Sequence, residues 1–297
     1  ESYGDEVILV ESSIKDRVRE IEESLSFSEF PIWNPSAVAY RTMYRAIHER
    51  GYRVVIEGHG SDEQLGGYPH LIDAAWKELV LRGRLKNAYE AFKVYQETLN
   101  PALGQEGASG ESSVRLASRM AAEFLLTILR KARRPSRHPL SLQGALDKDF
   151  GHRILPIVLR AFDRLSMSAS VESRSPFMDY RLVEFTRALP TDFKVGAIGS
   201  KAFLREILKK YGKDYIYADK RKIGFSSDLA KLFGDPAVKA FLREGIERFD
   251  DSTFAELKKD ALRDLDSPEV SWSNSTSIWK AASLGITASL YGIGTKS

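Results

Sequence analysis

The chain has 297 residues, of which 43% are hydrophobic and 29% are charged, so it is long enough and apolar enough to bury a large core. This composition excludes a disordered or fibrous protein, and a formal net charge of only +3 gives no reason to expect a nucleic-acid partner. The absence of Cys excludes a disulfide, a thiol nucleophile and a Cys-ligated metal site, and it is consistent with a cytoplasmic protein.

We expect neither a membrane span nor a signal peptide at the amino terminus of this sequence. The longest apolar stretches, 154–159 and 281–291, fall well short of the roughly 20 residues that a bilayer span needs, so we expect no membrane segment. The first residues have neither an initiator Met nor the order of a signal peptide. We therefore expect the chain to be a piece of a longer polypeptide, or the product of cutting or trimming one.

The first part of the chain alternates strand-like and helix-like stretches. Residues 6–10 (EVILV) and 53–57 (RVVIE) predict two buried strands because they are short β-branched runs. Helices are expected between them at 15–25 and 37–50. The order strand, helices, strand is typical of a parallel α/β sheet.

From His70 onward the hydrophobic period is helical, and few strands are expected. The predicted helices are 71–81, 85–99, 114–129, 154–167, 182–188, 202–211 and 275–290. Loops are expected at 100–113 and 132–141, where Pro, Gly, Ser or Arg accumulate. The basic cluster in the second loop either docks an acidic partner or is simply solvated, and the solvated interpretation is the commoner one. The sequence thus predicts an α/β domain with a largely helical C-terminal half.

A glycine-rich turn follows the second predicted strand, at residues 58–68 (GHGSDEQLGGY). Ligands of open parallel sheets bind beyond the carboxyl ends of the strands, and glycines let the backbone approach phosphate or ribose closely. Asp62 stands where a helix should begin, so it either holds Mg²⁺ against phosphates or only caps that helix. The turn alone leaves both interpretations open.

A second motif makes the interpretation specific. Residues 163–179 read DRLSMSASVESRSPFMD, which resembles the signature of the asparagine synthetase family. The stretches 200–205 and 220–225, and the turn at 58–68, are similar to other motifs of that family and occur in its order. The resemblance extends from about Pro31 to Trp279, and it is closest to the synthetase domain of glutamine-hydrolysing members, with β-lactam synthetase as a relative.

The resemblance implies that residues 1–297 form an ATP-pyrophosphatase domain, of the adenine nucleotide alpha hydrolase-like type. In this family a substrate carboxylate attacks the α-phosphorus of ATP, which gives an acyl-adenylate and pyrophosphate. Ammonia or an amine then displaces AMP. The implied cofactors are ATP and Mg²⁺, and the implied substrate is a small carboxylic acid. Ammonia would come from glutamine through a separate amino-terminal glutaminase domain, on the same or another chain.

Roles of individual residues follow from matching positions. Gly58, Gly60 and Ser61 match ATP-binding positions, and Asp62 and Lys201 match positions that bind Mg²⁺ and pyrophosphate. A long cationic side chain beside phosphates acts as a preorganised electrostatic clamp. The resemblance implies the same chemistry for one of the two lysines in the stretch 220–225 (KRKIGF).

That lysine is Lys222, which matches a catalytic position; its alternative is a solvated member of a charge run. Four further charged residues also match the family pattern, and we expect them to form buried structural pairs near the site rather than to react. They are Asp163, Arg164, Glu172 and Arg174.

Two departures from the family pattern stand out. The phosphate-binding loop S-G-G-x-D-S is not found in the sequence, so we expect it upstream of Glu1 or on another polypeptide; the other possibility is a non-catalytic scaffold relative. His59 occupies a position that is Glu in asparagine synthetases and Tyr in β-lactam synthetases. A neutral imidazole can take a proton from an amine, so His59 is a candidate catalytic base, unless it only hydrogen-bonds the turn. This residue motivates an alternative function as an amine-using cyclase of the β-lactam-synthetase or lasso-cyclase type.

Overall fold

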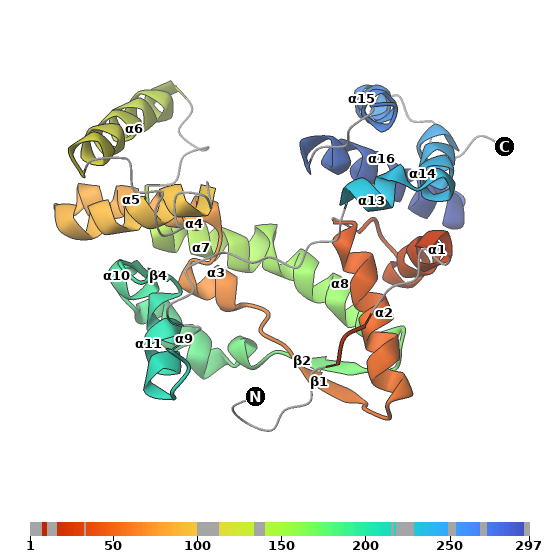
Figure 1. Ribbon diagram of the computed structural model, residues 1–297, viewed down its shortest axis with the longest axis horizontal. Coiled ribbons are helices and arrows are strands. Elements are labelled where there is room, and N and C mark those ends of the chain that lie inside the picture. The colour runs from red at the N-terminus through yellow and green to blue at the C-terminus, as the bar shows by residue number, and fades with distance from the viewer. Residues whose placement is uncertain are drawn as a thin grey trace. The chain divides into compact units, whose positions relative to one another are not determined.

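The computed structural model describes residues 8–10, 17–32, 34–99, 113–133, 140–214, 217, 229–248, 254–267 and 272–293. The chain forms two compact units (Figure 1). Unit 1 comprises Glu1–Ile56, Leu159–Arg174 and Gly224–Ser297, and unit 2 comprises Glu57–Val158 and Ser175–Ile223.

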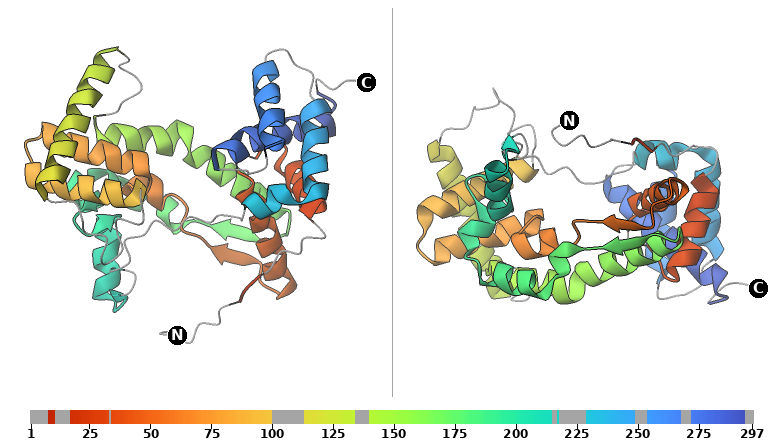
Figure 2. Two further views of the ribbon diagram at one scale, coloured as in Figure 1. Left: turned by 45° about the horizontal axis from the view of Figure 1, so that its top comes forward. Right: turned by 90° about the horizontal axis from the view of Figure 1, so that it is seen from below.

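Unit 1 contains a parallel pair of short strands. β1 (Val54–Ile56) lies beside β2 (Glu172–Arg174), with Val55 opposite Ser173 (Figures 1 and 2). The pair begins one residue earlier, where the Glu172 N–H donates to the carbonyl of Arg53 at 2.8 Å. The prediction of a parallel α/β arrangement is confirmed by this pairing.

Two expectations about these strands are wrong. Val54 and Ile56 are 43% and 77% exposed, because in the described part of the chain only β2 pairs with β1 and their side chains remain accessible to solvent. Residues 8–10 of the first predicted strand are irregular and exposed rather than paired. An apolar run becomes a strand only where a neighbouring strand satisfies its backbone groups.

Helices make up the rest of unit 1. They are α1 (Arg17–Ser28), α2 (Ser36–Glu49), most of α8 (Leu155–Met167), α13 (Leu229–Gly234), α14 (Pro236–Arg248), α15 (Ala255–Leu265) and α16 (Trp272–Leu290). The Trp279 side chain of α16 is 1% exposed, and its indole N–H donates to the carbonyl of Ile32 at 2.7 Å. Buried Arg41 and partly exposed Arg45 of α2 both bond the buried Glu20 of α1, at 3.0 and 2.6 Å. The bond from Trp279 joins the early and late parts of the sequence in one core.

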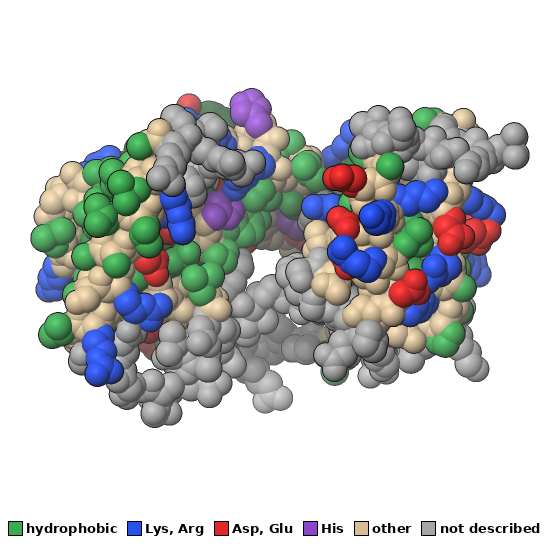
Figure 3. Space-filling model, turned by 90° about the horizontal axis from the view of Figure 1, so that it is seen from above, with side chains coloured by type: hydrophobic (Ala, Val, Ile, Leu, Met, Phe, Trp, Pro, Cys, Tyr) green, Lys and Arg blue, Asp and Glu red, His purple; other side chains and the backbone are tan. Residues whose placement is uncertain are grey.

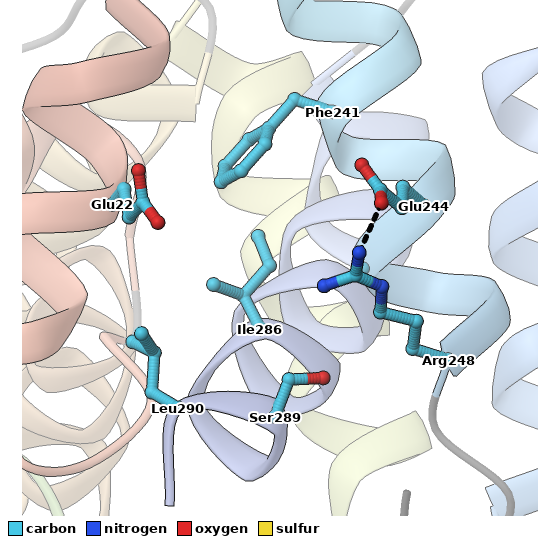
Figure 4. A pocket seen from close by; sticks show the side chains of 8 residues that line it. Glu22, Phe241, Glu244, Arg248, Ile286, Ser289 and Leu290 are labelled. Carbon is cyan, nitrogen blue, oxygen red and sulfur yellow. Dashed lines mark hydrogen bonds and ion pairs between the residues drawn. The ribbon is translucent and has the colours of Figure 1, made fainter. Parts of the chain in front are cut away.

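A cavity of about 130 Å³ lies where α1, α14 and α16 meet (Figure 4). Its lining mixes apolar side chains such as Phe241 and Ile286 with the ion pair between Glu244 and Arg248. Beside it, a Cβ on Gly245 of α14 would fall 2.4 Å from Cγ1 of Ile286 on α16. None of the residues in the sequence motifs lines this cavity.

Unit 2 is built on a helical hairpin. α4 (Pro69–Leu81) and α5 (Leu85–Leu99) pack side by side. Between them, the rings of Trp76 and Phe92 meet edge to face with their centroids 5.0 Å apart. α7 (Leu142–Lys148) completes the buried core with Leu142 and Leu146. The other elements are α3 (Ser61–Leu65), α6 (Ser113–Arg133), a π-helical turn η3 (Asp149–Arg153), the start of α8, η4 (Pro176–Met178), α9 (Tyr180–Ala188), α10 (Thr191–Lys194), β3 (Val195–Gly196), β4 (Gly199–Ser200) and α11 (Ala202–Lys210).

Buried polar contacts hold three of these helices together. The carboxylate of Glu78 on α4 accepts the Leu142 N–H at 2.6 Å and the Thr191 hydroxyl at 2.7 Å. Lys194 is 2% exposed and donates to Gln143 at 2.7 Å. Burial lowers the pKa of Lys194 to about 8, because the charged ammonium loses its hydration. Each polar group here has a partner, as buried polar groups require.

α6 presents large apolar side chains to solvent. Val114, Leu125 and Leu129 are 75%, 61% and 55% exposed, whereas Phe124 packs towards Trp76. Hydrophobic side chains, coloured green, gather on the left of the surface drawn in Figure 3. The basic cluster predicted to lie in a loop begins inside this helix, because α6 continues to Arg133, and residues 134–139 lie outside the described residues. None of the described helices is both long enough and apolar enough to cross a membrane.

The close approach at Gly245 yields a prediction for stability. Gly245→Ala should lower the free energy of unfolding by about 1–3 kcal/mol, because the new methyl group overlaps Ile286 and the two helices must separate. Urea unfolding measures the loss. Gly234→Ala is the control, since a Cβ there meets nothing within 4 Å. Equal stability of both variants would contradict the close packing of α14 on α16.

Candidate functional site

The glycine-rich turn follows β1 directly and depends on Gly60. This residue has φ of 91° and precedes α3, and a Cβ there would fall 2.8 Å from the sulfur of Met178. Only glycine combines this left-handed backbone with so close a neighbour. The turn therefore holds the PFMD stretch of the second motif against the first motif.

The side chain of Gln64 strengthens the same link. Its amide N–H donates to the carbonyl of Phe177 at 2.6 Å, and its oxygen accepts the hydroxyl of Thr186 on α9 at 2.7 Å. Gln64 is 4% exposed, so these bonds form away from competing water. Sequence reasoning missed Gln64, although its place one helical turn after Gly60 on the predicted helix was a usable signal.

Asp62 and Lys201 form the charged centre of the turn. Oδ1 of Asp62 lies 3.0 Å from Nζ of Lys201, which also donates to the Ser61 hydroxyl at 3.0 Å. Lys201 has φ of 55°, a conformation that residues other than glycine rarely adopt, and its backbone N–H donates to the carbonyl of Leu65 at 3.3 Å. Such strain is often found at functional sites. The structure thus brings Ser61, Asp62 and Lys201 together.

Gly67 leaves the room that this ion pair needs. A Cβ at Gly67 would fall 1.6 Å from Oδ1 of Asp62 and 2.7 Å from Cε of Lys201. The N–H groups of Gly66 and Gly67 both donate to the backbone carbonyl of Asp62, at 3.0 Å each. Asp62 lies in the first turn of α3, whose N-cap is Gly60, and its side chain faces Lys201. The capping interpretation of Asp62 is therefore wrong.

Glu63 points into the protein, unlike its neighbour Asp62. It is 2% exposed and accepts the hydroxyl of Tyr68 at 2.6 Å. Burial raises the pKa of the Glu63 carboxyl, and the bond from Tyr68 opposes that rise. Burial and the Glu63 carboxylate raise the pKa of the Tyr68 phenol. Glu63 thus anchors the turn.

A second polar cluster supports Tyr68 from the other side. The ring of His70 stacks on that of Tyr68 with centroids 5.7 Å apart, and Nε2 of His70 lies 2.5 Å from the carboxylate of Asp149. Asp149 is fully buried in η3 and also bonds Arg153 at 2.7 Å. Sequence reasoning missed this cluster because its members lie some 80 positions apart and match no known spacing.

His59 occupies the turn between the two glycines. Its Nε2 atom is shielded from solvent and lies 3.5 Å from Oε1 of Glu57. Both side chains are mostly buried, at 16% exposed for His59 and 14% for Glu57. Glu57 was not among the predicted site residues, and its separation of two positions from His59 was the available signal.

The charged residues of the second motif lie in unit 1 and are not buried. Arg174 bonds Glu172 at 2.9 Å, with side chains 63% and 55% exposed. Arg164 bonds Glu29 at 2.9 Å, and Asp163 is exposed. The expectation of buried pairs is wrong, because the alternating strand β2 turns Glu172 and Arg174 to the same accessible side. Lys222, the other predicted catalytic residue, lies outside the described residues.

A divalent cation has one candidate ligand here. Across the described ranges, no three His, Cys, Asp or Glu side chains gather in a way that would hold a metal ion. Mg²⁺ commonly uses one or two carboxylates and completes its shell with water and substrate phosphates. The partly exposed carboxylate of Asp62, in the space that Gly67 leaves open, fits a site of that kind.

The residues of the site lie in a region of the chain that is similar to known proteins. Residues 3–287 match the family model described as "Asparagine synthase". The chain is similar to "Amidase chyE" of Penicillium rubens, with 24% identity over 263 residues that cover 74% of this chain and 39% of that protein. It is also similar to "Amidase chry2" of Gibberella zeae, with 21% identity over 267 residues and coverages of 74% and 39%. The match therefore spans about two fifths of the length of these relatives.

The role of Gly67 can be tested structurally. Gly67→Ala should push Asp62 and Lys201 apart, and a crystal structure of the variant should show Oδ1 and Nζ beyond the 4 Å ion-pair limit. Because the displaced atoms end flexible side chains, the free energy of unfolding should fall by only about 1 kcal/mol. Gly151→Ala, where a Cβ meets nothing within 4 Å, is the control. An intact ion pair in Gly67→Ala would refute the steric argument.

Proposed function

The chain belongs to the asparagine synthase family, and from this premise we propose that it is the synthetase part of an ATP-dependent amide-forming ligase. Membership implies a ligase, and the family uses ATP. In our proposal the enzyme adenylates a small carboxylic acid and transfers ammonia to it. The observation that carries the proposal is the ion pair of Asp62 and Lys201 beside Ser61, at the end of a glycine turn that follows a parallel strand.

The first half-reaction is adenylation. A carboxylate oxygen of the substrate bonds to the α-phosphorus of ATP, the bond from that phosphorus to the bridging oxygen breaks, and pyrophosphate leaves. The Lys201 ammonium is held in place before the reaction and can stabilise the charge that gathers on the leaving phosphates. Asp62 would hold Mg²⁺, which when bound supplies charge neutralisation to the phosphates. Gly58, Gly60 and Ser61 would contact the nucleotide.

The second half-reaction forms the amide. The nitrogen nucleophile bonds to the acyl carbon, the bond from that carbon to the AMP oxygen breaks, and a proton leaves the nitrogen. His59 is our candidate to accept this proton. Lys222 is proposed to stabilise the tetrahedral intermediate. Asp163, Arg164, Glu172 and Arg174 remain proposed as structural residues, without a part in the reaction.

Several parts of the proposal concern the wider protein. We propose the ATP-pyrophosphatase type of α/β fold, which the parallel pairing of β1 with β2 supports. The relatives are much longer than the matched region, which agrees with a phosphate loop and a glutaminase domain on the same or another polypeptide. We also propose a cytoplasmic location. The name "amidase" belongs to those relatives and does not define the reaction of this chain.

A second candidate is an amine-using cyclase, favoured by His59 in the turn. Such an enzyme shares the adenylation step and replaces ammonia by an amine of the substrate. The third candidate is a scaffold without catalytic activity. The ion pair of Asp62 and Lys201 speaks against it, because a scaffold has no need of charges placed for phosphates.

The proposed function predicts nucleotide binding. The native polypeptide should bind Mg-ATP in calorimetry, and Asp62→Asn should weaken the affinity at least tenfold, about 1.4 kcal/mol, because a carboxylate next to Mg²⁺ is lost. Asp260→Asn, an exposed pair member on α15, should leave the affinity unchanged. Absence of any binding at millimolar ATP would favour the scaffold.

A further prediction distinguishes ammonia from an amine as the nitrogen nucleophile. His59→Ala should slow amide formation by roughly 10²–10⁴ and leave pyrophosphate exchange into ATP nearly unchanged, because a base acts only after adenylation. Ammonium chloride and candidate amine substrates, each supplied as the only nucleophile, are compared by mass spectrometry. Product from an internal amine but none from ammonium would overturn the ammonia-transferring function in favour of the cyclase.

A further inference from the structure

Helix α6 has two apolar sides, and only one of them packs on the protein. Leu116, Met120 and Phe124 face inwards and pack against the buried core of unit 2. These positions recur every four residues, so they form one side of the helix. The other apolar side is exposed, and the function proposed above does not use it.

The exposed apolar side consists of Val114, Ala121, Leu125, Ile128 and Leu129, which we call the outer stripe. On a helix with 3.6 residues per turn, these positions fall within about 100° of each other. Val114, Leu125 and Leu129 are more than half exposed, and Ile128 is 38% exposed. Contiguous apolar surface on a protein commonly marks a site of interaction with another protein or a membrane.

Basic side chains lie beside the outer stripe. Arg115, Arg119 and Arg130 are exposed and follow one flank of the helix, which we call the arginine flank. Arg119 also donates to Gln96 of α5 at 2.6 Å. Residues 113–133 contain five basic residues and one acidic residue, Glu123. The exposed part of α6 therefore combines a stripe of aliphatic side chains with positive charge.

The charge and shape of α6 distinguish between possible occupants of this face. A second copy of the chain would bring two arginine flanks together, and like charges repel. The outer stripe contains no aromatic side chain of the kind that anchors contacts between proteins. It lies on the convex side of one helix, at the outer edge of unit 2 (Figures 1 and 2). A flat, negatively charged surface with an apolar interior complements both features.

We propose that the outer stripe and the arginine flank of α6 bind the surface of a membrane that contains anionic lipids. The helix lies in the plane of the interface, with the outer stripe at the acyl chains and the arginines at the phosphate headgroups. A helix in this position does not cross the bilayer, so it needs neither the length nor the apolarity of a membrane span. This binding goes beyond the proposed function and does not depend on its chemistry.

Vesicle co-sedimentation tests the binding with the native polypeptide. Vesicles of phosphatidylcholine are compared with vesicles in which about a third of the lipid is phosphatidylglycerol. Binding should be roughly tenfold stronger to the anionic vesicles, because each basic side chain near a negative surface favours association. Salt at about 1 M should weaken this binding, because the Debye length then falls to about 3 Å.

The outer stripe is tested by Leu125→Gln combined with Leu129→Gln. Binding to the anionic vesicles should fall at least tenfold, to roughly a tenth or less, because two leucine side chains no longer leave water. Both residues are exposed, so the fold should be retained, which circular dichroism checks. The matched control is Ile157→Gln combined with Leu290→Gln, two exposed apolar residues of α8 and α16, which should bind as the wild type does.

The arginine flank is tested by Arg115→Gln combined with Arg130→Gln. Binding to the anionic vesicles should fall roughly tenfold, and binding to the neutral vesicles should not change, because only the anionic surface attracts these charges. Equal affinity of the wild type for both kinds of vesicle would overturn the role of the arginines. No binding to either kind, or wild-type binding by the leucine variant, would overturn the membrane site.

A fluorescent label reports on the same face directly. The chain contains no Cys, so Leu125→Cys provides a labelling position for a polarity-sensitive fluorophore. Its emission should shift to the blue when anionic vesicles are added. A label already shielded without vesicles would show that another part of the native polypeptide covers the face. A dimer that the leucine variant abolishes would show that a second copy covers it, and either result would overturn the membrane site.

Discussion

The site depends on one ion pair, between Asp62 and Lys201. It joins two segments that lie 139 positions apart, with the Ser61 hydroxyl bound to the same ammonium. Two local features accompany it: Gly67 leaves the space that the carboxylate occupies, and Lys201 has a left-handed backbone whose N–H donates to the carbonyl of Leu65 in the turn. Without a ligand the two charges neutralise each other. With phosphates and Mg²⁺ present, the same groups would face a different set of charges.

Around this pair, the turn is held by contacts made by its own side chains. Gln64 ties α3 to η4 and α9, and Glu63 ties it to Tyr68. These bonds are buried, so they are strengthened by the low local polarity and resist distortion. A rigid turn with fixed donors is what electrostatic catalysis needs, because reorganisation during the reaction is then small. The buried bonds of Glu63 and Gln64 therefore support the chemistry proposed for Asp62 and Lys201.

The sequence predicted the helices with strong amphipathic periodicity well, such as α5, whose bounds match the prediction, and α4 and α8, which differ by one or two residues. It missed α14 and α15, and it placed a strand at 6–10, where residues 8–10 are irregular. The family resemblance pointed to Ser61, Asp62 and Lys201, which the structure brings together. It could not find Asp149, which reaches His70 only through tertiary packing, or Glu57, because the glycine-rich motif begins one residue after it.

The central claim is that a carboxylate is activated as its adenylate. Isotope transfer tests it most directly: the native polypeptide is given Mg-ATP, a nitrogen nucleophile and the carboxylic acid that supports pyrophosphate release, labelled with ¹⁸O in its carboxyl group. Our account predicts that one ¹⁸O atom appears in AMP for each amide formed, because the oxygen that attacks the α-phosphorus stays with it. Label in inorganic phosphate with ADP as the other product, or amide formed without any ¹⁸O in AMP, would contradict the account.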